Sequence, residues 1–333
     1  MKKNVAIIAG GYSSEFEVSL RSAENLYSYI DKERYNVYKV IITEDTWIAT
    51  APSNSPERGE LESQIDKNNF SFCHDNKTVQ IDFAYITIHG TPGEDGRLQG
   101  YFDMLGIPYS TCGVLTSALT FNKYVCNQFL KSHGITVADA MLFRKGQPVD
   151  PEKLVESLGL PLFVKPNEGG SSFGITKVKE ASQIQDAVDK AFDESAEVIV
   201  ERFIAGVELT CGCYQSGNQT IVFPVTEVIS KNEFFDYGAK YNGEVQEITP
   251  ARISAGLTEK IQRETEKIYH LIGAKGIIRI DYIVTPDVIP VMLEVNTTPG
   301  MTATSFIPQQ VGVAGLNMKD IMTDMIENNG QTK

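Results

Sequence analysis

Short apolar runs alternate with mixed segments through the first third of the chain. The runs at 4–11, 35–43 and 81–90 have the length and residue types of buried strands, whereas 13–30 has the apolar spacing and the Ser and Glu start of a helix. Strands that alternate with helices favour a parallel sheet covered by helices. The stretch 51–80 is polar and contains two prolines, and we expect it to be an irregular surface excursion.

Helical spacing reappears at 117–134, where Gly134 suits a helix end because glycine readily adopts the left-handed backbone. Strand patterns at 160–166 and 196–204 flank a further helix near 180–195. The middle of the chain is therefore also predicted to combine strands and helices.

The last third has a different pattern. Strand-like runs follow one another at 208–215, 219–229, 275–284 and 288–296, with turn residues between several of them. One helix, at 258–273, separates the second run from the third. This order predicts antiparallel hairpins rather than a continued parallel sheet.

Composition narrows the class of protein. At 333 residues the chain is too long for one compact core, and its 42% hydrophobic and 22% charged residues are ordinary for a soluble globular protein. No apolar run reaches the ~18 residues of a membrane span, and the run at 5–9 ends in a glycine pair rather than a signal cleavage site. A net charge of −13 argues against a nucleic-acid partner, although a small phosphate ligand would need only a local group of donors.

The cysteines indicate a reducing compartment. They are scattered, odd in number and without a CxxC motif, so we expect small buried thiols in a cytoplasmic protein. The five are Cys73, Cys112, Cys126, Cys211 and Cys213.

Two strand patterns near the end of the chain carry polar interruptions. Glu294 and Asn296 lie two apart in one, and Arg279 and Asp281 lie two apart in the other. Residues two apart share a face of a strand, and a turn at 285–290 would make the strands neighbours, so these side chains should meet at one cavity. Two carboxylates and an amide oxygen suit a hard cation such as Mg²⁺, which takes its other ligands from phosphates and water. The alternative is a buried salt bridge between Arg279 and one of the carboxylates.

A glycine- and serine-rich segment, 165–174, follows a predicted strand. Its glycines let the backbone approach a ligand and turn amides toward phosphate oxygens, while Ser171 and Ser172 add hydroxyls and Lys165 adds a cation. The segment lacks the GK[ST] spacing of a P-loop, and an ordinary flexible turn is the alternative.

Further polar groups stand at predicted turns. Glu201 and Glu208 can take the amine or ribose hydroxyls of a nucleotide, although solvated surface charges would look the same. Lys240 and Tyr241 lie in a segment rich in glycine and aromatic residues, which suits a loop closing on phosphate but also any surface loop.

Glu15 and His89 each follow the carboxyl end of a predicted parallel strand. Alone, either would be an ordinary helix-start or turn residue. Ligands bind at this edge of open α/β sheets, however, and both residues are therefore candidates for contact with a substrate.

Taken together, these motifs resemble those of the D-alanine–D-alanine ligases of the ATP-grasp superfamily over nearly the whole chain. The matching motifs, in the family's order, are GGYSSEFEVSL, IHGTPGEDGRLQG, FNKYVCNQFL, VKPNEGGSSFG, ERFIAGVELT, DYGAKY, RIDY and LEVNTTPGMTATS. The resemblance implies an N-terminal Rossmann-like domain at 1–111 and two ATP-grasp subdomains at 112–204 and 205–333.

The resemblance also implies the reaction. The carboxylate of one D-alanine takes the γ-phosphoryl group of ATP, and the amine of a second D-alanine attacks the acylphosphate, for peptidoglycan precursor and cell wall synthesis. Glu15 would hold the first ammonium group with Ser171 and Tyr241, and His89 would lie in the substrate-side loop. The residues implied for the second step are Arg279 and the Gly300 N–H as oxyanion donors and Ser305 for the second carboxylate.

For the nucleotide and metal, the resemblance implies two Mg²⁺ ions, with Mn²⁺ as a substitute, and a homodimer. The ATP-binding residues would be Lys123, Lys165, Ser171, Ser172, Glu201, Ile204, Glu208 and Lys240, and the metal ligands Asp281, Glu294 and Asn296.

Two departures from the family pattern bear on loop shape. Thr91–Pro92 stands where glycine is more usual, and Phe173 stands where a smaller apolar residue is common. Tyr241 favours D-alanine as the second substrate, because D-alanine–D-lactate enzymes of the family tend to lack this tyrosine.

Two other functions are considered. One is an ATP-grasp ligase with a different acceptor, which is disfavoured by the joint presence of Glu15, Tyr241 and Ser305. The other is a nucleotide-binding regulatory protein without catalysis, which would need neither Arg279 nor the two metal carboxylates.

Overall fold

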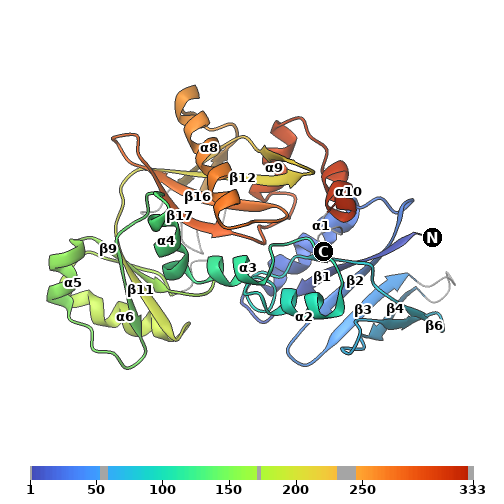
Figure 1. Ribbon diagram of the computed structural model, residues 1–333. Helices are drawn as coiled ribbons and strands as arrows, with labels where there is room; N and C mark the ends of the chain where they lie inside the picture. Colours follow the sequence, from blue (N-terminus) through green and yellow to red (C-terminus); the bar gives the residue numbers. More distant parts are fainter. Residues whose placement is uncertain (1, 53–58, 171–173, 231–244, 329–333) are drawn as a thin grey trace.

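The computed structural model of the chain describes residues 2–52, 59–170, 174–230 and 245–328. Figure 1 shows three sheet-containing regions, with the N-terminal region in blue, the central region in green and the C-terminal region mainly in orange and red. Each of the three larger sheets takes its strands from one of the predicted segments 1–111, 112–204 and 205–333. The domain boundaries at these positions remain a prediction.

The N-terminal sheet is mixed. Strand β1 pairs in parallel with β2 and β7, as the alternating pattern predicted, but β2, β3 and β4 pair antiparallel. The strand order is β4-β3-β2-β1-β7, with bounds β1 Lys3–Gly10, β2 Tyr35–Ile42, β3 Trp47–Pro52, β4 Glu60–Gln64 and β7 Phe83–Ile86.

The prediction of an irregular excursion at 51–80 was wrong. This stretch contains the end of β3, strand β4 and a hairpin of β5 (Phe72–His74) and β6 (Lys77–Val79). Ile65, Phe70 and Phe72 are buried: Phe70 is 0% exposed and packs edge-on against Phe102, with ring centroids 4.9 Å apart. Sparse apolar residues thus cover one face of the sheet although the surrounding sequence is polar.

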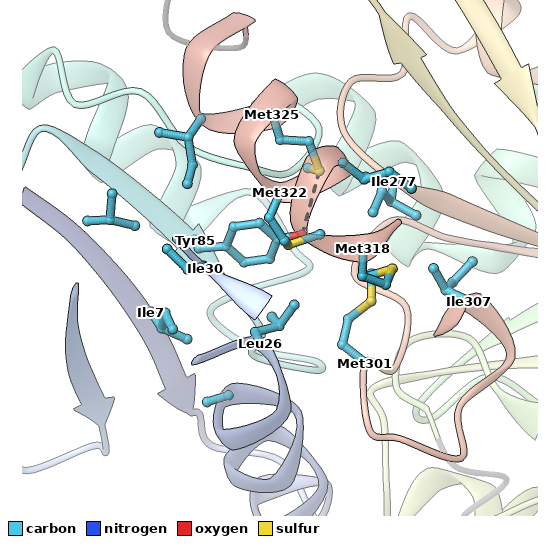
Figure 2. Close-up of a cluster of buried hydrophobic side chains, with 14 of the residues drawn as sticks. Ile7, Leu26, Ile30, Tyr85, Ile277, Met301, Ile307, Met318, Met322 and Met325 are labelled. Carbon is cyan, nitrogen blue, oxygen red and sulfur yellow. Dashed lines mark hydrogen bonds between the residues drawn. The ribbon is translucent and has the colours of Figure 1, made fainter. Parts of the chain in front are cut away.

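The other face of the N-terminal sheet is covered by two helices from opposite ends of the described chain (Figure 1). Helix α1 (Phe16–Tyr29) buries Leu26 there, and α10 (Met318–Asn328) packs beside it. Figure 2 shows Tyr85 of β7 facing the methionines of α10, with its hydroxyl donating to Met325 Sδ at 3.6 Å. The C-terminal helix therefore completes the core of the N-terminal region.

The prediction of a single helix at 117–134 was wrong, because the structure has two helices in this part of the chain. Helix α3 (Val114–Phe121) ends before Asn122, whose backbone is extended, and α4 (Lys123–Ser132) begins after it. The Asn122 side chain accepts from the Val125 N–H at 3.0 Å, so it caps α4 and separates the helices. Gly134 follows α4 at φ 75°, which agrees with its predicted role at the helix end.

The central sheet confirms the strands and helix predicted there. Its order is β10-β9-β11-β8, and β9 and β11 pair antiparallel. Helices α5 and α6 bury Leu154, Leu158 and Val188 against it. The bounds are β8 Ala140–Arg144, α5 Pro151–Leu158, β9 Leu162–Pro166, β10 Thr176–Val178, α6 Ile184–Phe192 and β11 Glu197–Arg202.

The C-terminal sheet is antiparallel, as predicted, in the order β15-β14-β12-β16-β17 with β13 paired to β12. The strand predicted at 219–229 is divided into β13 and β14 around Pro224, because proline lacks the N–H that a central strand needs. The bounds are β12 Val207–Ser216, β13 Gln219–Val222, β14 Thr226–Ser230, β15 Val245–Ile248, β16 Ile278–Val284 and β17 Pro290–Asn296, with helices α2 Arg97–Leu105, α8 Ala255–Leu271 and α9 Phe306–Val313.

All five cysteines carry free thiols. Four are buried as expected, whereas Cys73 is exposed on the short strand β5. Within the described ranges, no helix combines the length and apolar character needed to cross a membrane.

The shared core predicts a stability effect of α10. Met322 is 0% exposed among residues of the N-terminal sheet, so Met322→Ala should lower the free energy of unfolding by about 2–4 kcal/mol. Met104, which is 82% exposed on α2, provides the control, and its alanine variant should change stability by less than about 0.5 kcal/mol. Urea unfolding measures both, and equal effects would contradict the packing described.

Candidate functional site

One cavity of about 470 Å³ lies where the three regions meet. The N-terminal region contributes Glu15 and His89, and the central part of the chain contributes Lys123 and Gly170. The predicted residues that line it from the C-terminal region are Arg279, Glu294, Asn296, Gly300 and Ser305. Residues predicted from separate motifs are therefore brought together in one pocket.

The two polar-interrupted strands are direct neighbours. In the β16–β17 register, Asp281 lies opposite Glu294 and Arg279 lies opposite Asn296. Arg279 donates to both oxygens of Asp281, at 2.9 and 2.8 Å, and Thr210 Oγ1 donates to the same carboxylate at 2.6 Å. The ion pair weighed as an alternative is thus present, with both partners only 12–13% exposed.

The pair is set inside a larger polar group. The Asn296 amide donates to Asp281 Oδ2 at 3.2 Å and to Glu294 Oε1 at 3.4 Å. Burial opposes the charged form of Arg279, but the Asp281 carboxylate outweighs burial and raises the Arg279 pKa. Arg279 is therefore a permanent cation at the wall of the pocket.

The donor set on β16 and β17 fits a hard cation that also binds a ligand. Two carboxylates and a side-chain amide are the oxygen donors that Mg²⁺ takes from proteins, and an amide can turn its oxygen inward without changing shape. In the described ranges, no group of three or more His, Cys, Asp or Glu is spaced to hold a metal. A cation held here would accordingly need further oxygens from a phosphate ligand or water.

Two predicted nucleotide contacts pair with each other. Lys165 Nζ lies 2.7 Å from Glu201 Oε2, and Asn127 of α4 donates to the other oxygen of Glu201 at 3.2 Å. The pair forms because Glu201 on β11 lies two positions from Ile199, the residue opposite Lys165. Neither side chain is among those lining the cavity, and the same holds for Ile204 and Glu208.

Lys123, by contrast, reaches the pocket. It is the first residue of α4, and its ammonium group donates to the Gly169 carbonyl at 2.6 Å. Burial disfavours the charged form and lowers the pKa of Lys123. The contact fixes Gly169, in the middle of the glycine- and serine-rich segment, against α4.

The same segment lies directly on Glu15. A Cβ added at Gly170 would meet the Glu15 carboxylate, so a larger residue at this position would require that carboxylate to move. Glu15 itself is 9% exposed and immediately precedes α1. Ser171, Ser172, Phe173, Lys240 and Tyr241 lie outside the described residues.

The loop that follows β7 is tied to the start of α1. Ser13 Oγ donates to the His89 carbonyl at 2.7 Å, and the Tyr12 N–H donates to the Thr91 carbonyl at 2.9 Å. Thr91–Pro92 was noted above as a departure from the family pattern. The peptide bond between these two residues is cis. The loop after β7 and the segment before α1 therefore lie together, and His89 and Glu15 from these two segments line the same pocket.

Glu94, in the same loop, was missed among the candidate residues. It lines the cavity and accepts from the Gly90 N–H at 2.7 Å. Burial, followed by the negative charge of Glu15, raises the pKa of Glu94 to about 7. The sequence feature that could have identified Glu94 was its position in the acidic, glycine-rich motif that follows His89.

The far wall is built by the start of α9. Ser305 Oγ accepts from the Thr302 N–H at 3.0 Å and lies within hydrogen-bond distance of the Thr302 hydroxyl, at 2.7 Å. Gln309 and Glu247 also line the cavity and were not predicted; the Gln309 amide donates to Glu247 at 2.6 Å. This bond joins the strand that follows residues 231–244 to the helix behind Ser305.

Comparisons with known proteins agree with this arrangement. A family model described as "D-ala D-ala ligase N-terminus" matches residues 4–112, and one described as "D-ala D-ala ligase C-terminus" matches residues 129–327. A D-alanine–D-alanine ligase of Parabacteroides distasonis is 62% identical over 98% of both chains. One from Bacteroides fragilis is 58% identical over 98% of this chain and 99% of the relative.

Solved structures give the same result for the fold. A D-Ala:D-Ser ligase from Enterococcus faecalis superposes with a TM-score of 0.87 at 32% identity, covering 99% of this chain and 100% of that one. D-alanyl-alanine synthetase A from Vibrio cholerae gives 0.88 at 28% identity, covering 99% of both chains. The fold is that of an ATP-grasp enzyme. The chain belongs to the D-alanine–D-alanine ligase family.

The raised pKa of Glu94 predicts a pH effect on stability. Its folded-state pKa is about 7 against an ordinary 4.5, so the protonated folded state is favoured and stability is lost as pH rises between these values. Glu94→Gln cannot ionise and can still accept the Gly90 N–H. Relative to this variant, the wild type should lose at most about 3 kcal/mol of unfolding free energy across that range.

Urea unfolding at several pH values measures the difference. Glu17→Gln, in the first turn of α1, is the control for removing a negative charge nearby. Parallel pH curves for the wild type and Glu94→Gln would contradict the raised pKa.

Proposed function

We propose that this protein joins two molecules of D-alanine into D-alanyl-D-alanine at the expense of ATP, releasing ADP and phosphate. The observation that carries the proposal is the convergence of Glu15, Arg279 and the Gly300–Ser305 turn on one pocket, in a chain of this family. An ammonium-binding carboxylate, an oxyanion donor and a carboxylate-binding turn are the groups that peptide-bond formation between amino acids requires.

In the first step, a carboxylate oxygen of one D-alanine attacks the γ-phosphorus of ATP, and the bond from that phosphorus to the β-phosphate oxygen breaks. The products are an acylphosphate and ADP. Glu15, buried at the start of α1, pairs with the ammonium group of this substrate. On the family resemblance, Ser171 and Tyr241 act with Glu15 in binding this substrate. His89 lies beside it in the loop after β7. These contacts orient the carboxylate toward ATP.

ATP lies between the central and C-terminal sheets in this proposal. Lys123, Lys165 and Lys240 neutralise its phosphates, with Ser171 and Ser172 as hydroxyl donors. Glu201, Ile204 and Glu208 hold the adenine and ribose. The Lys165–Glu201 ion pair, 2.7 Å long, would then exchange its partners for ATP on binding.

Asp281, Glu294 and Asn296 would hold two Mg²⁺ ions, replaceable by Mn²⁺, together with the phosphates. The bound cations would supply positive charge to neutralise the charge that develops on the transferred phosphoryl group. Asp281 also accepts from Arg279 and Thr210, and these bonds hold its carboxylate in a fixed orientation.

In the second step, the amine of the second D-alanine attacks the acyl carbon, and phosphate leaves the tetrahedral intermediate. Arg279 and the Gly300 N–H donate to the oxyanion of that intermediate. Ser305, at the start of α9, binds the carboxylate of the second substrate. Glu15, Ser171, Tyr241, Arg279, Gly300 and Ser305 together form the catalytic set.

The cellular setting follows from the chemistry. The dipeptide is a peptidoglycan precursor, and its synthesis from ATP belongs in the cytoplasm, where the free thiols of this chain stay reduced. We propose a homodimer on family grounds, with each subunit divided at 111/112 and 204/205.

The direct test is phosphate release by the purified protein with ATP, Mg²⁺ and D-alanine. L-alanine controls for stereochemistry, and mixtures of D-alanine with D-serine or D-lactate test the acceptor. We expect D-alanine-dependent phosphate release with D-alanyl-D-alanine as the main product. Absence of D-alanine-dependent release would overturn the proposal, and preference for D-serine or D-lactate would reassign the acceptor.

The metal role has its own test. Glu294→Gln should lower turnover at limiting Mg²⁺ by about a hundredfold, because it removes one of two carboxylates from the cation site. The fold should be retained, since glutamine can still accept from the Asn296 amide.

Glu259→Gln is the matched control, because Glu259 is 66% exposed on α8 and pairs with Arg263 of the same helix. The rate is measured against Mg²⁺ concentration for both variants. Glu294→Gln activity equal to that of Glu259→Gln at limiting Mg²⁺ would contradict the metal role.

A further inference from the structure

Helix α1 holds the turn at Gly300 by two hydrogen bonds to the next residue, Met301. Ser22 Oγ accepts from the Met301 N–H at 3.2 Å, and the Asn25 side-chain amide donates to the Met301 carbonyl at 2.7 Å. Ser22 is 0% exposed and Asn25 is partly buried, three positions further along the helix. Residues three apart lie on the same side of a helix, so one helix face satisfies both backbone groups of Met301.

The side chain of Met301 is fixed as well. It is 4% exposed and belongs to the core shared by α1, α9 and α10, where Figure 2 shows it near Met318 and Ile307. Burial of this side chain and the two bonds to α1 fix the residue that follows Gly300. This matters because glycine has more backbone freedom than any other residue, and its neighbours must restrict it.

The same helix also sets the opposite side of the pocket. Glu15 immediately precedes it, and Ser19 Oγ accepts from the Gly10 N–H at 2.9 Å, which anchors α1 at the carboxyl end of β1. Ser22 lies seven positions after Glu15, or about 10 Å along a helix that rises about 1.5 Å per residue. Helix α1 therefore fixes the distance between the site of the substrate ammonium group and the Gly300 turn.

We propose that Ser22 and Asn25 are positioning residues for the second step of the reaction: through Met301 they hold the Gly300 N–H where it meets the tetrahedral oxyanion. This inference rests on the proposed function. Neither side chain lines the cavity, so neither is a catalytic residue. Their effect is confined to the step in which the oxyanion forms.

The test separates the two steps in Ser22→Ala and Asn25→Ala. Positional isotope exchange in ATP with D-alanine reports formation of the acylphosphate, and dipeptide formation reports the whole reaction. The kcat for dipeptide formation should fall about tenfold in each variant. This loss is smaller than the one expected when an oxyanion donor is itself removed, because the Gly300 N–H is displaced and not lost. Isotope exchange and the KM for ATP should stay within about twofold of the wild type.

A phosphinate mimic of the tetrahedral intermediate gives a second readout. Its inhibition constant should rise by the same factor as dipeptide kcat falls, because both depend on the Gly300 donor. Ser22→Cys keeps the size of the side chain with a weaker acceptor and should give an intermediate loss. Ser28→Ala is the control, since it removes an exposed hydroxyl from the same helix that donates to the Asn25 carbonyl at 2.6 Å.

The outcomes are distinct. Unchanged dipeptide synthesis in both alanine variants, or equal loss of isotope exchange and synthesis, would overturn the positioning role. A wild type that forms no dipeptide would instead overturn the proposed function. Thermal unfolding of each variant is measured in parallel, and if Ser22→Ala does not fold, the partly exposed Asn25→Ala still decides the question.

Discussion

The bidentate ion pair between Arg279 and Asp281 is the interaction on which the site depends. Breaking such a pair by removing one partner leaves a buried charge without compensation, at a cost of several kcal/mol. The strand that carries it alternates strictly: Ile278, Ile280 and Tyr282 are 0% exposed and pack toward α8, while Arg279 and Asp281 point to the opposite face. The C-terminal sheet thus has one apolar face, packed toward α8, and one ionic face, which lies at the cavity.

The pocket depends equally on contacts between regions that are far apart in the sequence. Lys123 reaches Gly169, Gly170 lies on Glu15, and the Ser13 hydroxyl bonds to the loop after β7. Each contact joins two of the sequence motifs from which the site was predicted. The apolar core between the N-terminal sheet and α10 packs these regions together, and none of its side chains lines the cavity.

Much of this arrangement could be predicted from the sequence because its signals are local. Polar residues two apart in apolar strands indicated the Arg279–Asp281 and Glu294–Asn296 faces, and glycine turns after β1 and β7 marked the edge of the N-terminal sheet that lies at the cavity. The stretch 51–80 was misjudged because a few buried aromatic residues outweigh many polar ones. The division of the helix at Asn122 was also missed. In the sequence, an N-cap asparagine cannot be distinguished from any other polar residue of a helix, and only the backbone shows the break. Lys165 and Glu201 could not be paired in advance, since strand register is a tertiary property.

The placement of α10 has a consequence for synthesis on the ribosome. Residues 318–328 emerge long after β1 and β7, yet they cover the sheet face that these strands form. Until then, Ile7, Phe83 and Tyr85 lack part of their native cover and expose apolar surface of the kind that chaperones recognise. Completion of the core of the first region made is thereby tied to the last helix described.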